Sequence, residues 1–350
     1  MTMRPAGGYF FEDYQVGQVF DHAVPRTITH GDTALYQALT GSRNPLHCSE
    51  PFAQALGFPA APVDDLLVFH IAFGKTVPDI SYNAVANLGY AECRFLLPVF
   101  VGDTLTARTT VLGLKGNSNG KTGVVYVRST CFNQHDQAVL TWVRWVMVHR
   151  RVAIGAGEHA ANGETQFAAM VAPAHCRPAP GQADLSAVLS ATGSAQYWED
   201  LEAGQQIAHP AGMTLDETDH TLATKLYQNT ARVHFDLQHM KDSRFGKRLI
   251  YGGQVISICR ALAFDGLGNA LSILAINGGA HVNPTFAGDT LYAVHTATEK
   301  WPLNAQFGAV RLVLDGYKNL DPASPDFNDL AEAHQVLALD YTVLMPRRHN

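Results

Sequence analysis

Two mainly apolar segments stand out in the pattern of hydrophobic and polar positions, and each predicts a buried helix. They cover Val63–Val77 and Gly253–Phe264, and both are apolar all round, which indicates burial on every face. Each run is followed by segments rich in β-branched and aromatic residues, which predict strands. The predicted strands are Ala84–Phe95, Thr104–Leu114, Thr122–Phe132 and Val139–Val148, and later Leu271–His281, Thr290–Thr298, Gly308–Leu314 and Val336–Leu344.

A short helix is predicted before each buried helix. The segments Asp32–Leu39 and Asp219–Leu226 both begin with an aspartate, a residue that commonly caps a helix N-terminus. One buried helix followed by an antiparallel sheet is an α+β unit, and the chain carries this unit twice.

Self-comparison of the sequence supports a duplication. Phe10–Asp13 (FFED) reappears as Tyr197–Asp200 (YWED), and the motif PxFxGDTL occurs at Pro98 and again at Pro284. Each half ends with an apolar run and an Arg-Arg pair. Similarity at many positions in one order indicates two copies of a structural unit. We therefore predict an N-terminal domain over residues 1–150 and a C-terminal domain over residues 193–350.

Two segments lack the periodicity of a helix or strand. Residues 151–192 are rich in Ala, Gly and Pro, and they predict a linker long enough to carry the chain across the molecule. The Pro- and Asp-rich segment Asn319–His334 predicts a surface loop. In the PxFxGDTL motif we expect a structural role, in which the Asp caps backbone N–H groups.

Composition and charge exclude several classes of protein. The chain has 350 residues, of which 47% are hydrophobic and only 16% charged, yet it has no apolar run long enough to cross a membrane. The first residues lack a basic region followed by an apolar region, so we expect no secretory signal there. The net charge is −6 and the basic residues are scattered, which argues against nucleic-acid binding. The five cysteines are far apart and form no CxxC pair, so we expect a reduced, cytoplasmic protein without a cysteine-based zinc site.

One loop and its context resemble a known family. Gly41–His47 (GSRNPLH) precedes the first buried helix and the PxFxGDTL strand. This order resembles the MaoC-like dehydratase family, whose loop reads Gly-Asp-x-Asn-Pro-Leu-His. The resemblance covers both halves and implies a tandem (double) hot-dog fold, in which each half is an antiparallel sheet wrapped around a central helix. Closer similarity to the mesaconyl-CoA hydratase subgroup comes from Phe73–Ser81, Asn83–Glu92, Val143–Val148, Gln228–Asp236 and Arg248–Gly253.

The resemblance implies an activity and a set of residue types. The activity is reversible addition of water to an enoyl-CoA, for the subgroup mesaconyl-CoA to β-methylmalyl-CoA. The residues are an Asp and a His, five positions apart, that orient and deprotonate the water, and a glycine N–H at the start of the buried helix. An imidazole suits the base because its pKa lies near neutrality, and a fixed N–H donor stabilises the enolate-like thioester oxygen. The implied chemistry needs no metal or redox cofactor.

The two halves differ at these positions. His47 and His234 are equivalent, but the residue five positions earlier is Ser42 in one half and Asn229 in the other, so both lack the Asp. The position of the helix glycine holds Gly252 in the second half and Asp65 in the first. We therefore predict the active site in the second half, from His234, Asn229 and the Gly252 backbone. The alternative is a site in the first half with Ser42 and His47.

Other candidates have competing interpretations. Arg232 could pair with a substrate carboxylate, or it could be a surface residue or contact CoA phosphate. Asp236 is a candidate replacement acid, although a solvated carboxylate is the simpler interpretation. His70 is expected to be a hydrogen-bonded core histidine. The spacing of His234 and His239 matches no common zinc motif.

Alternative functions remain open at this stage. They are hydration of another enoyl-CoA, an acyl-CoA thioesterase of hot-dog fold, and a non-catalytic acyl-CoA-binding protein, which the missing Asp would favour. A homodimer is also expected, because the apolar composition leaves surface for association beyond the pairing of the two halves.

Overall fold

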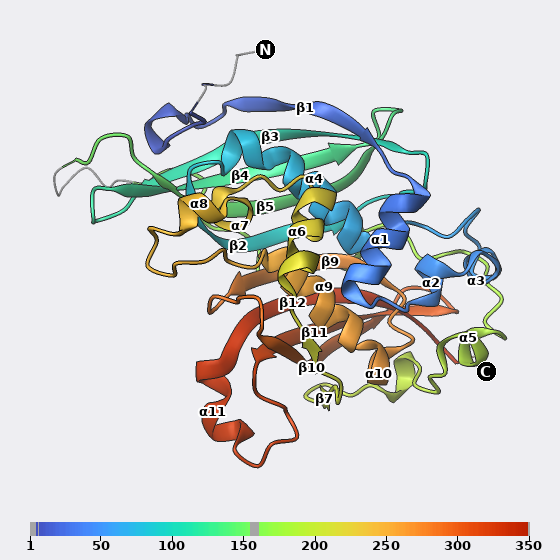
Figure 1. Ribbon diagram of the computed structural model, residues 1–350. Coiled ribbons are helices and arrows are strands. Elements are labelled where there is room, and N and C mark those ends of the chain that lie inside the picture. The colour runs from blue at the N-terminus through green and yellow to red at the C-terminus, as the bar shows by residue number, and fades with distance from the viewer. Residues whose placement is uncertain (1–4, 6, 155–160, 349–350) are drawn as a thin grey trace.

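The computed structural model describes residue 5 and residues 7–154 and 161–348, and Figure 1 shows it as two similar halves joined side by side. The first half consists of η1 (Phe11–Asp13), β1 (Val19–Thr27), α1 (His30–Thr40), α2 (Pro45–Cys48), α3 (Glu50–Ala55), α4 (Asp65–Ile80), β2 (Ala84–Phe95), β3 (Thr104–Gly116), β4 (Thr122–Phe132) and β5 (Ala138–His149). The long helix followed by antiparallel strands is the predicted α+β unit.

The second half repeats this order. It consists of η3 (Trp198–Asp200), β7 (Gln206–Ala208), β8 (Met213–Thr214), α6 (Glu217–Leu226), α7 (Arg232–Phe235), α8 (Leu237–Met240), α9 (Gly252–Leu262), α10 (Phe264–Leu267), β9 (Ser272–His281), β10 (Thr290–Pro302), β11 (Phe307–Lys318), α11 (Phe327–His334) and β12 (Gln335–Pro346). The tandem hot-dog prediction is therefore confirmed, with α4 and α9 as the two central helices.

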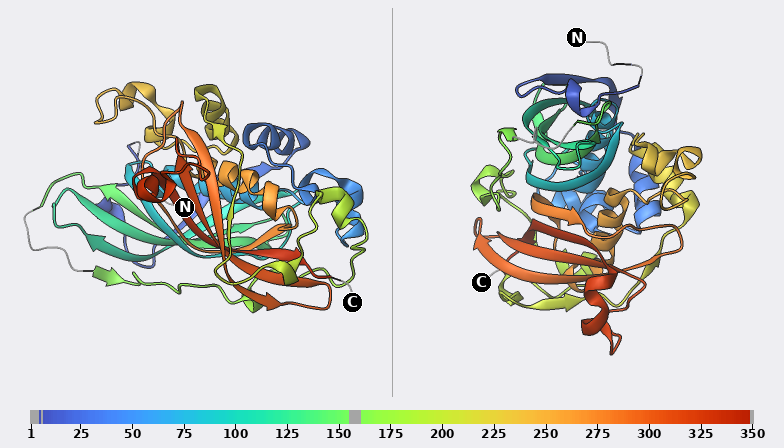
Figure 2. Two further views of the ribbon diagram at one scale, coloured as in Figure 1. Left: turned by 90° about the horizontal axis from the view of Figure 1, so that it is seen from below. Right: turned by 90° about the vertical axis from the view of Figure 1, so that its left-hand side faces the viewer.

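A single antiparallel sheet runs through both halves. Its strand order is β1-β3-β4-β5-β2-β9-β12-β11-β10-β7, so β2 and β9 meet at the centre and join the two units. In this pair Tyr90 lies opposite Gly279 and Cys93 lies opposite Ile276. Figure 2 shows most of the helices, including α4 and α9, gathered in a layer on one face of this sheet. Consequently, residues of the first half and of the second half line the same space near the central seam.

The two central helices pack against each other as well as on the sheet. Their contact includes a hydrogen bond between His70 Nε2 of α4 and Ser257 Oγ of α9, at 2.8 Å. His70 is fully buried, and burial lowers its pKa to about 3, so its prediction as a core histidine is confirmed. One continuous hydrophobic core contains α4, α9 and the inner faces of both sets of strands. This explains why both helices are apolar all round.

The segment predicted as a linker runs along the opposite face of the sheet from the helical layer (Figure 2) and contains β6 (Ala161–Gly163), η2 (Pro173–His175) and α5 (Val188–Thr192). The N–H of Val171 donates to Asn277 Oδ1 at 2.9 Å, and Phe167 stacks on Trp145 with ring centroids 6.1 Å apart. Residues 155–160 lie outside the described part of the chain. The described part is therefore anchored to the sheet that it crosses.

The predicted loop Asn319–His334 is corrected by the structure, because its second part forms the helix α11. Phe327 packs against Tyr317 of β11 with ring centroids 4.9 Å apart, which anchors the helix. The aspartate of each PxFxGDTL motif does cap the backbone as predicted. Asp103 Oδ2 accepts from Phe100 N at 2.8 Å, and Asp289 Oδ2 accepts from Phe286 N at 2.9 Å.

No helix in the described ranges is long and apolar enough to cross a membrane.

A close approach of the two halves predicts one sensitive glycine. A Cβ at Gly74 of α4 would lie 1.8 Å from the carbonyl oxygen of Tyr227, which follows α6. Gly74→Ala should therefore push the halves apart and lower the free energy of unfolding by about 1–3 kcal/mol, the usual range for overpacking. Chemical denaturation followed by circular dichroism measures this change. Gly181→Ala is the control, because a Cβ there meets nothing within 4 Å. Equal stability of the two variants would contradict the proposed contact.

Candidate active site

A cavity of about 370 Å³ lies at the seam between the two halves. The first half supplies part of its wall from α4, β2 and β5, and the second half supplies α7, the start of α9 and the end of β9. In Figure 1, α7 lies over the strands of the first half. Among the predicted site residues, the cavity brings together His234, Asn229 and Gly252. The remaining wall is mostly apolar, as expected for a small-molecule site.

His234 is positioned as a proton acceptor. Its Nδ1 lies 2.9 Å from the carbonyl oxygen of Leu249, and since a carbonyl only accepts, Nδ1 carries the proton. The lone pair of Nε2 is then free to accept a proton from a group in the cavity. Burial lowers the pKa of His234 to about 4, so the imidazole is neutral near pH 7.

Asn229 shapes the loop that carries His234. Its side chain is buried, and Oδ1 accepts from the N–H of Ala231 at 3.1 Å, just before α7 begins. The preceding Gln228 has a φ of 54°, in the left-handed region, so the chain turns sharply here. With one lone pair of Oδ1 used by the backbone, Asn229 offers its amide group and a second lone pair for further contacts.

Gly252 places the N-terminus of α9 at the cavity wall. The first N–H groups of an α-helix lack partners within the helix and carry partial positive charge. A Cβ at Gly252 would come within 2.3 Å of the His281 ring, so only glycine allows this approach. The N–H of the preceding Tyr251 donates to His220 Nε2 at 3.0 Å, which ties the start of α9 to α6.

His281 is a second cavity imidazole that sequence reasoning missed. It ends β9, and its Nε2 lies 3.2 Å from the hydroxyl of Tyr90 across the seam. Burial, and then the proximity of His234, lower the pKa of His281 to about 4. The repeat contains a signal for it: His281 precedes Pro284 by the same spacing by which Phe95 precedes Pro98. A polar residue thus replaces a core aromatic in one copy only.

The charged side chains of the cavity wall are all basic among the described residues. Arg144 and Arg244 line it, but no Asp or Glu does so within the described residues. The dyad implied by the family resemblance therefore has its histidine but no carboxylate here. The described residues also contain no group of three or more His, Cys, Asp or Glu side chains that could hold a metal ion.

Arg232, predicted to contact substrate, does not line the cavity. Its guanidinium lies over the ring of Tyr82, 4.7 Å from the centroid, and Nη2 donates to the Tyr82 hydroxyl at 3.1 Å. Asp236, the other candidate of this segment, caps α8 by accepting from His239 N at 2.9 Å. Adjacency to His234 in sequence therefore does not bring either residue into the cavity wall.

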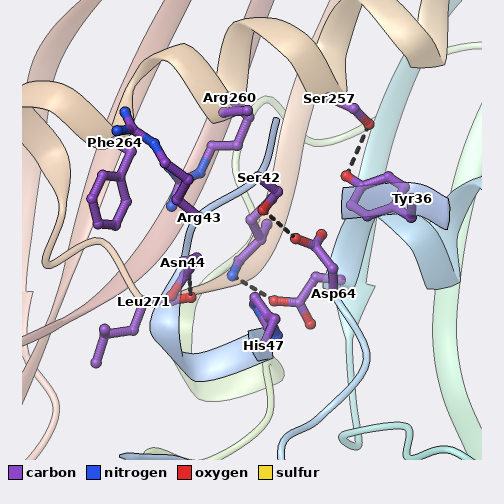
Figure 3. A pocket seen from close by; sticks show the side chains of 13 residues that line it. Tyr36, Ser42, Arg43, Asn44, His47, Asp64, Ser257, Arg260, Phe264 and Leu271 are labelled. Atoms are coloured by element: carbon purple, nitrogen blue, oxygen red, sulfur yellow. Dashed lines mark hydrogen bonds between the residues drawn. The ribbon is translucent and has the colours of Figure 1, made fainter. Parts of the chain in front are cut away.

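The equivalent position in the first half is nearly filled. Ser42, Asn44 and His47, labelled in Figure 3, line the pocket at this position. Its volume is only about 20 Å³, room for about one water molecule. His47 repeats the backbone contact of His234, since its Nδ1 lies 3.0 Å from the carbonyl oxygen of Pro62. Ser42 Oγ donates to Asp64 Oδ2 at 3.4 Å. The alternative pair Ser42 and His47 therefore keeps its loop but lacks a substrate-sized space.

A buried ion pair stands where the second half has its glycine. Asp65 Oδ2 lies 2.8 Å from Arg177 Nη2 and accepts from Ile273 N at 2.8 Å. Both charged side chains are almost fully buried. A carboxylate at the start of α4 would repel a developing oxyanion, so this half lacks the electrostatics for a thioester carbonyl.

Comparisons with known proteins identify relatives of this chain. The sequence profile described as MaoC like domain matches residues 12–131. The chain is 48% identical to a beta-methylmalyl-CoA dehydratase of Chloroflexus aurantiacus, over 99% of this chain and 100% of that protein. It is 49% identical to a mesaconyl-CoA hydratase of Cereibacter sphaeroides, over 99% and 100%.

Two solved structures also resemble this chain over nearly its whole length. A putative MaoC domain protein dehydratase from Chloroflexus aurantiacus matches with a TM-score of 0.93 and 47% identity, covering 99% of this chain and 100% of that one. A Mycobacterium tuberculosis protein described as having a double hotdog fold matches with a TM-score of 0.77 and 27% identity, covering 98% and 100%.

Buried neutral histidines predict an acid-sensitive fold. The pKa values of His70 and His220 are lowered to about 3, and those of His234 and His281 to about 4, all mainly by burial. In the unfolded chain each returns to about 6.5. Between about pH 4 and pH 6.5 the unfolded chain therefore binds more protons, so the free energy of unfolding falls as the pH falls through this window.

Urea denaturation at several pH values between 4.5 and 7.5 measures this slope. His281→Phe, which introduces the residue of the other copy, should flatten it, whereas the exposed His135→Asn should leave it unchanged. A free energy of unfolding that stays constant across the window in the unmodified chain would contradict the prediction.

Proposed function

This chain belongs to the MaoC-like dehydratase family, and we propose that it catalyses the reversible hydration of mesaconyl-CoA to β-methylmalyl-CoA. The observation that carries the proposal is that one cavity holds both the His234 imidazole and the N-terminus of α9, in a chain that matches two such enzymes over their whole length. The substrate class is a branched enoyl-CoA whose acyl group carries a second, free carboxylate.

The proposed chemistry uses these two groups at opposite ends of the conjugated thioester. His234 Nε2 takes a proton from water as the water oxygen bonds to Cβ of the enoyl group. Electrons of the double bond move toward the thioester oxygen, which accepts a hydrogen bond from the Gly252 N–H. One such donor is worth about 10²–10³ in rate. The protonated imidazole then returns its proton to Cα, and the reverse sequence dehydrates β-methylmalyl-CoA.

Several features of the cavity support this assignment of roles. The proton on His234 Nδ1 is held by the Leu249 carbonyl, which fixes the tautomer that a base at Nε2 requires. Asn229 takes the place of the family's Asp and orients water through its amide, without a negative charge. The proposed reaction needs no cofactor, because the CoA thioester is itself the substrate.

We also propose a cytoplasmic location and a homodimer. The five cysteines are free thiols, which suits a reducing compartment. Light scattering of the purified protein measures the assembly state.

Removing the imidazole tests the assignment of the active half. His234→Ala should lower kcat for mesaconyl-CoA by about 10²–10⁴-fold, since a positioned general base contributes this much. The matched variant His47→Ala removes the equivalent ring from the filled half and should keep kcat within a few-fold of the wild type. The decrease of enoyl-thioester absorbance gives the rate.

The outcomes separate the competing functions. Loss of activity in His47→Ala but not in His234→Ala would move the active site to the first half. Free thiol release without loss of the double bond would identify a thioesterase instead. Tight binding of acyl-CoA without any turnover would identify a binding protein.

The pH profile offers an independent test of the base. Because His234 acts as a base only when neutral, and its pKa is lowered to about 4, kcat/KM should stay level from about pH 8 to pH 5 and fall below about pH 4. Enzyme exposed to each pH and then assayed at pH 7 shows whether the fall reflects protonation or unfolding. An acid limb centred near pH 6.5 in fully folded enzyme would contradict this assignment.

A further inference from the structure

An arginine of the first half is buried in the cavity wall of the second. Arg144 lies on β5, is 1% exposed, and reaches the cavity that contains His234 and Gly252. Its Nη2 donates to Thr76 Oγ1 at 2.8 Å and to Ser81 Oγ at 3.3 Å, and Nη1 donates to Ser81 Oγ at 3.4 Å. The guanidinium carbon stands over the ring of Phe73, 4.1 Å from the centroid.

The charge of Arg144 has no counter-ion among the residues that the structure describes. Within the described residues no carboxylate pairs with it, and its buried Nε–H has no hydrogen-bond partner. An unpaired charge in an apolar interior is costly, whereas a buried guanidinium paired with a carboxylate is a common and stable arrangement. A group that the protein itself does not supply would complete this position.

We propose that Arg144 binds the free carboxylate of the acyl group and thereby makes the enzyme specific for dicarboxylic enoyl-CoA esters. The inference rests on the proposed function and names its specificity-determining residue. An acyl group that enters between His234 and the α9 N-terminus occupies the same cavity as Arg144. Its terminal carboxylate supplies the missing negative charge and the acceptor for the unused N–H donor.

Other arginines near the cavity do not meet these requirements. Arg244 also lines the wall, but it is exposed and its guanidinium covers the ring of Phe245 at 4.5 Å. Arg232 is engaged with Tyr82 and does not line the cavity. Arg144 is therefore the cationic side chain whose burial and free donor both favour a desolvated carboxylate.

The duplication supports a specialised role for this position. When the Arg-Arg pairs that end the two halves are aligned, Arg144 corresponds to Tyr341 of β12. Tyr341 is buried, and its hydroxyl lies 2.7 Å from His295 Nε2, so its polar group has a partner inside the protein. The second copy thus has a self-contained core pair where the first copy presents a guanidinium to the cavity.

Binding of two saturated analogues tests the proposal without catalysis. The probes are 2-methylsuccinyl-CoA, which keeps the free carboxylate, and 2-methylbutyryl-CoA, in which a methyl group replaces it. Arg144→Met should weaken binding of the first by about 100-fold, the value of a charge-assisted buried contact, and change the second by less than a few-fold. Arg144→Lys should fall between Met and wild type for the first analogue. Isothermal titration calorimetry measures all of these constants.

Matched controls separate the carboxylate contact from other effects. Arg232→Met removes a nearby guanidinium and should leave the ratio of the two affinities unchanged. Thermal melts establish that each variant is folded, and Arg144→Lys, which keeps the charge, serves if Arg144→Met does not fold. Unchanged discrimination in either folded Arg144 variant, or lost discrimination in Arg232→Met, would overturn the proposal.

Kinetics distinguish failure of this inference from failure of the proposed function. Wild-type enzyme should hydrate mesaconyl-CoA and strongly disfavour 2-methylcrotonyl-CoA, which has a methyl group in place of the carboxylate. In Arg144→Met this preference should shrink by about 100-fold. Absence of any hydration in wild type would refute the function, while the calorimetric ratio would still decide whether Arg144 binds the carboxylate.

Discussion

The antiparallel pairing of β2 with β9 is the constraint on which the rest of this molecule depends. It joins two duplicated units into one sheet and fixes which residues of one half face the other. Tyr90 of the first half reaches His281 of the second across this seam, and both line the cavity with His234. Neither half alone contains the candidate site, so the proposed catalysis depends on the tandem arrangement.

Duplication also freed the two copies to diverge. In the first half the start of the central helix carries Asp65, and a buried pair with Arg177 from the linker offsets its desolvation. In the second half Gly252 has no side chain, so its backbone can lie close to the His281 ring. The first position stabilises the contact between the halves and the linker, while the second leaves helix N–H groups available for a ligand. The start of the central helix has thus become structural in the first half and stays open to a ligand in the second.

The sequence predicted the parts of this arrangement that local pattern controls. The repeated order of helix and strands, the paired histidines and the Gly252 position follow from comparing one half with the other. Arg144 and His281 could not be placed in this way. They line one cavity only because strands from different halves pair with each other. Comparison of the copies does mark both, as Arg144 against Tyr341 and His281 against Phe95.

Spacing along the sequence did not predict in which direction a side chain points. Arg232 is two residues from His234, yet on the short helix α7 it points to Tyr82, since neighbouring positions of a helix face different directions. The prediction of a loop for Asn319–His334 was wrong in its second part. The Pro and Asp residues of the segment favour a loop, but the packing of Phe327 on Tyr317 anchors the helix α11 there.

No Asp or Glu among the described residues lines the cavity, which fits the same electrostatics that favour Arg144 as the proposed receptor for the acyl carboxylate. Two unit negative charges about 6 Å apart repel by about 3 kcal/mol at an effective dielectric constant of about 20. An Asp at position 229 would add a second negative charge to the cavity that we propose holds the carboxylate of the substrate. Asn229 keeps the hydrogen-bonding shape of that side chain without the charge, and the buried guanidinium of Arg144 makes the cavity electrically complementary to an anionic acyl group. On this proposal, the departure from the family's Asp and the buried guanidinium of Arg144 serve the same dicarboxylic substrate.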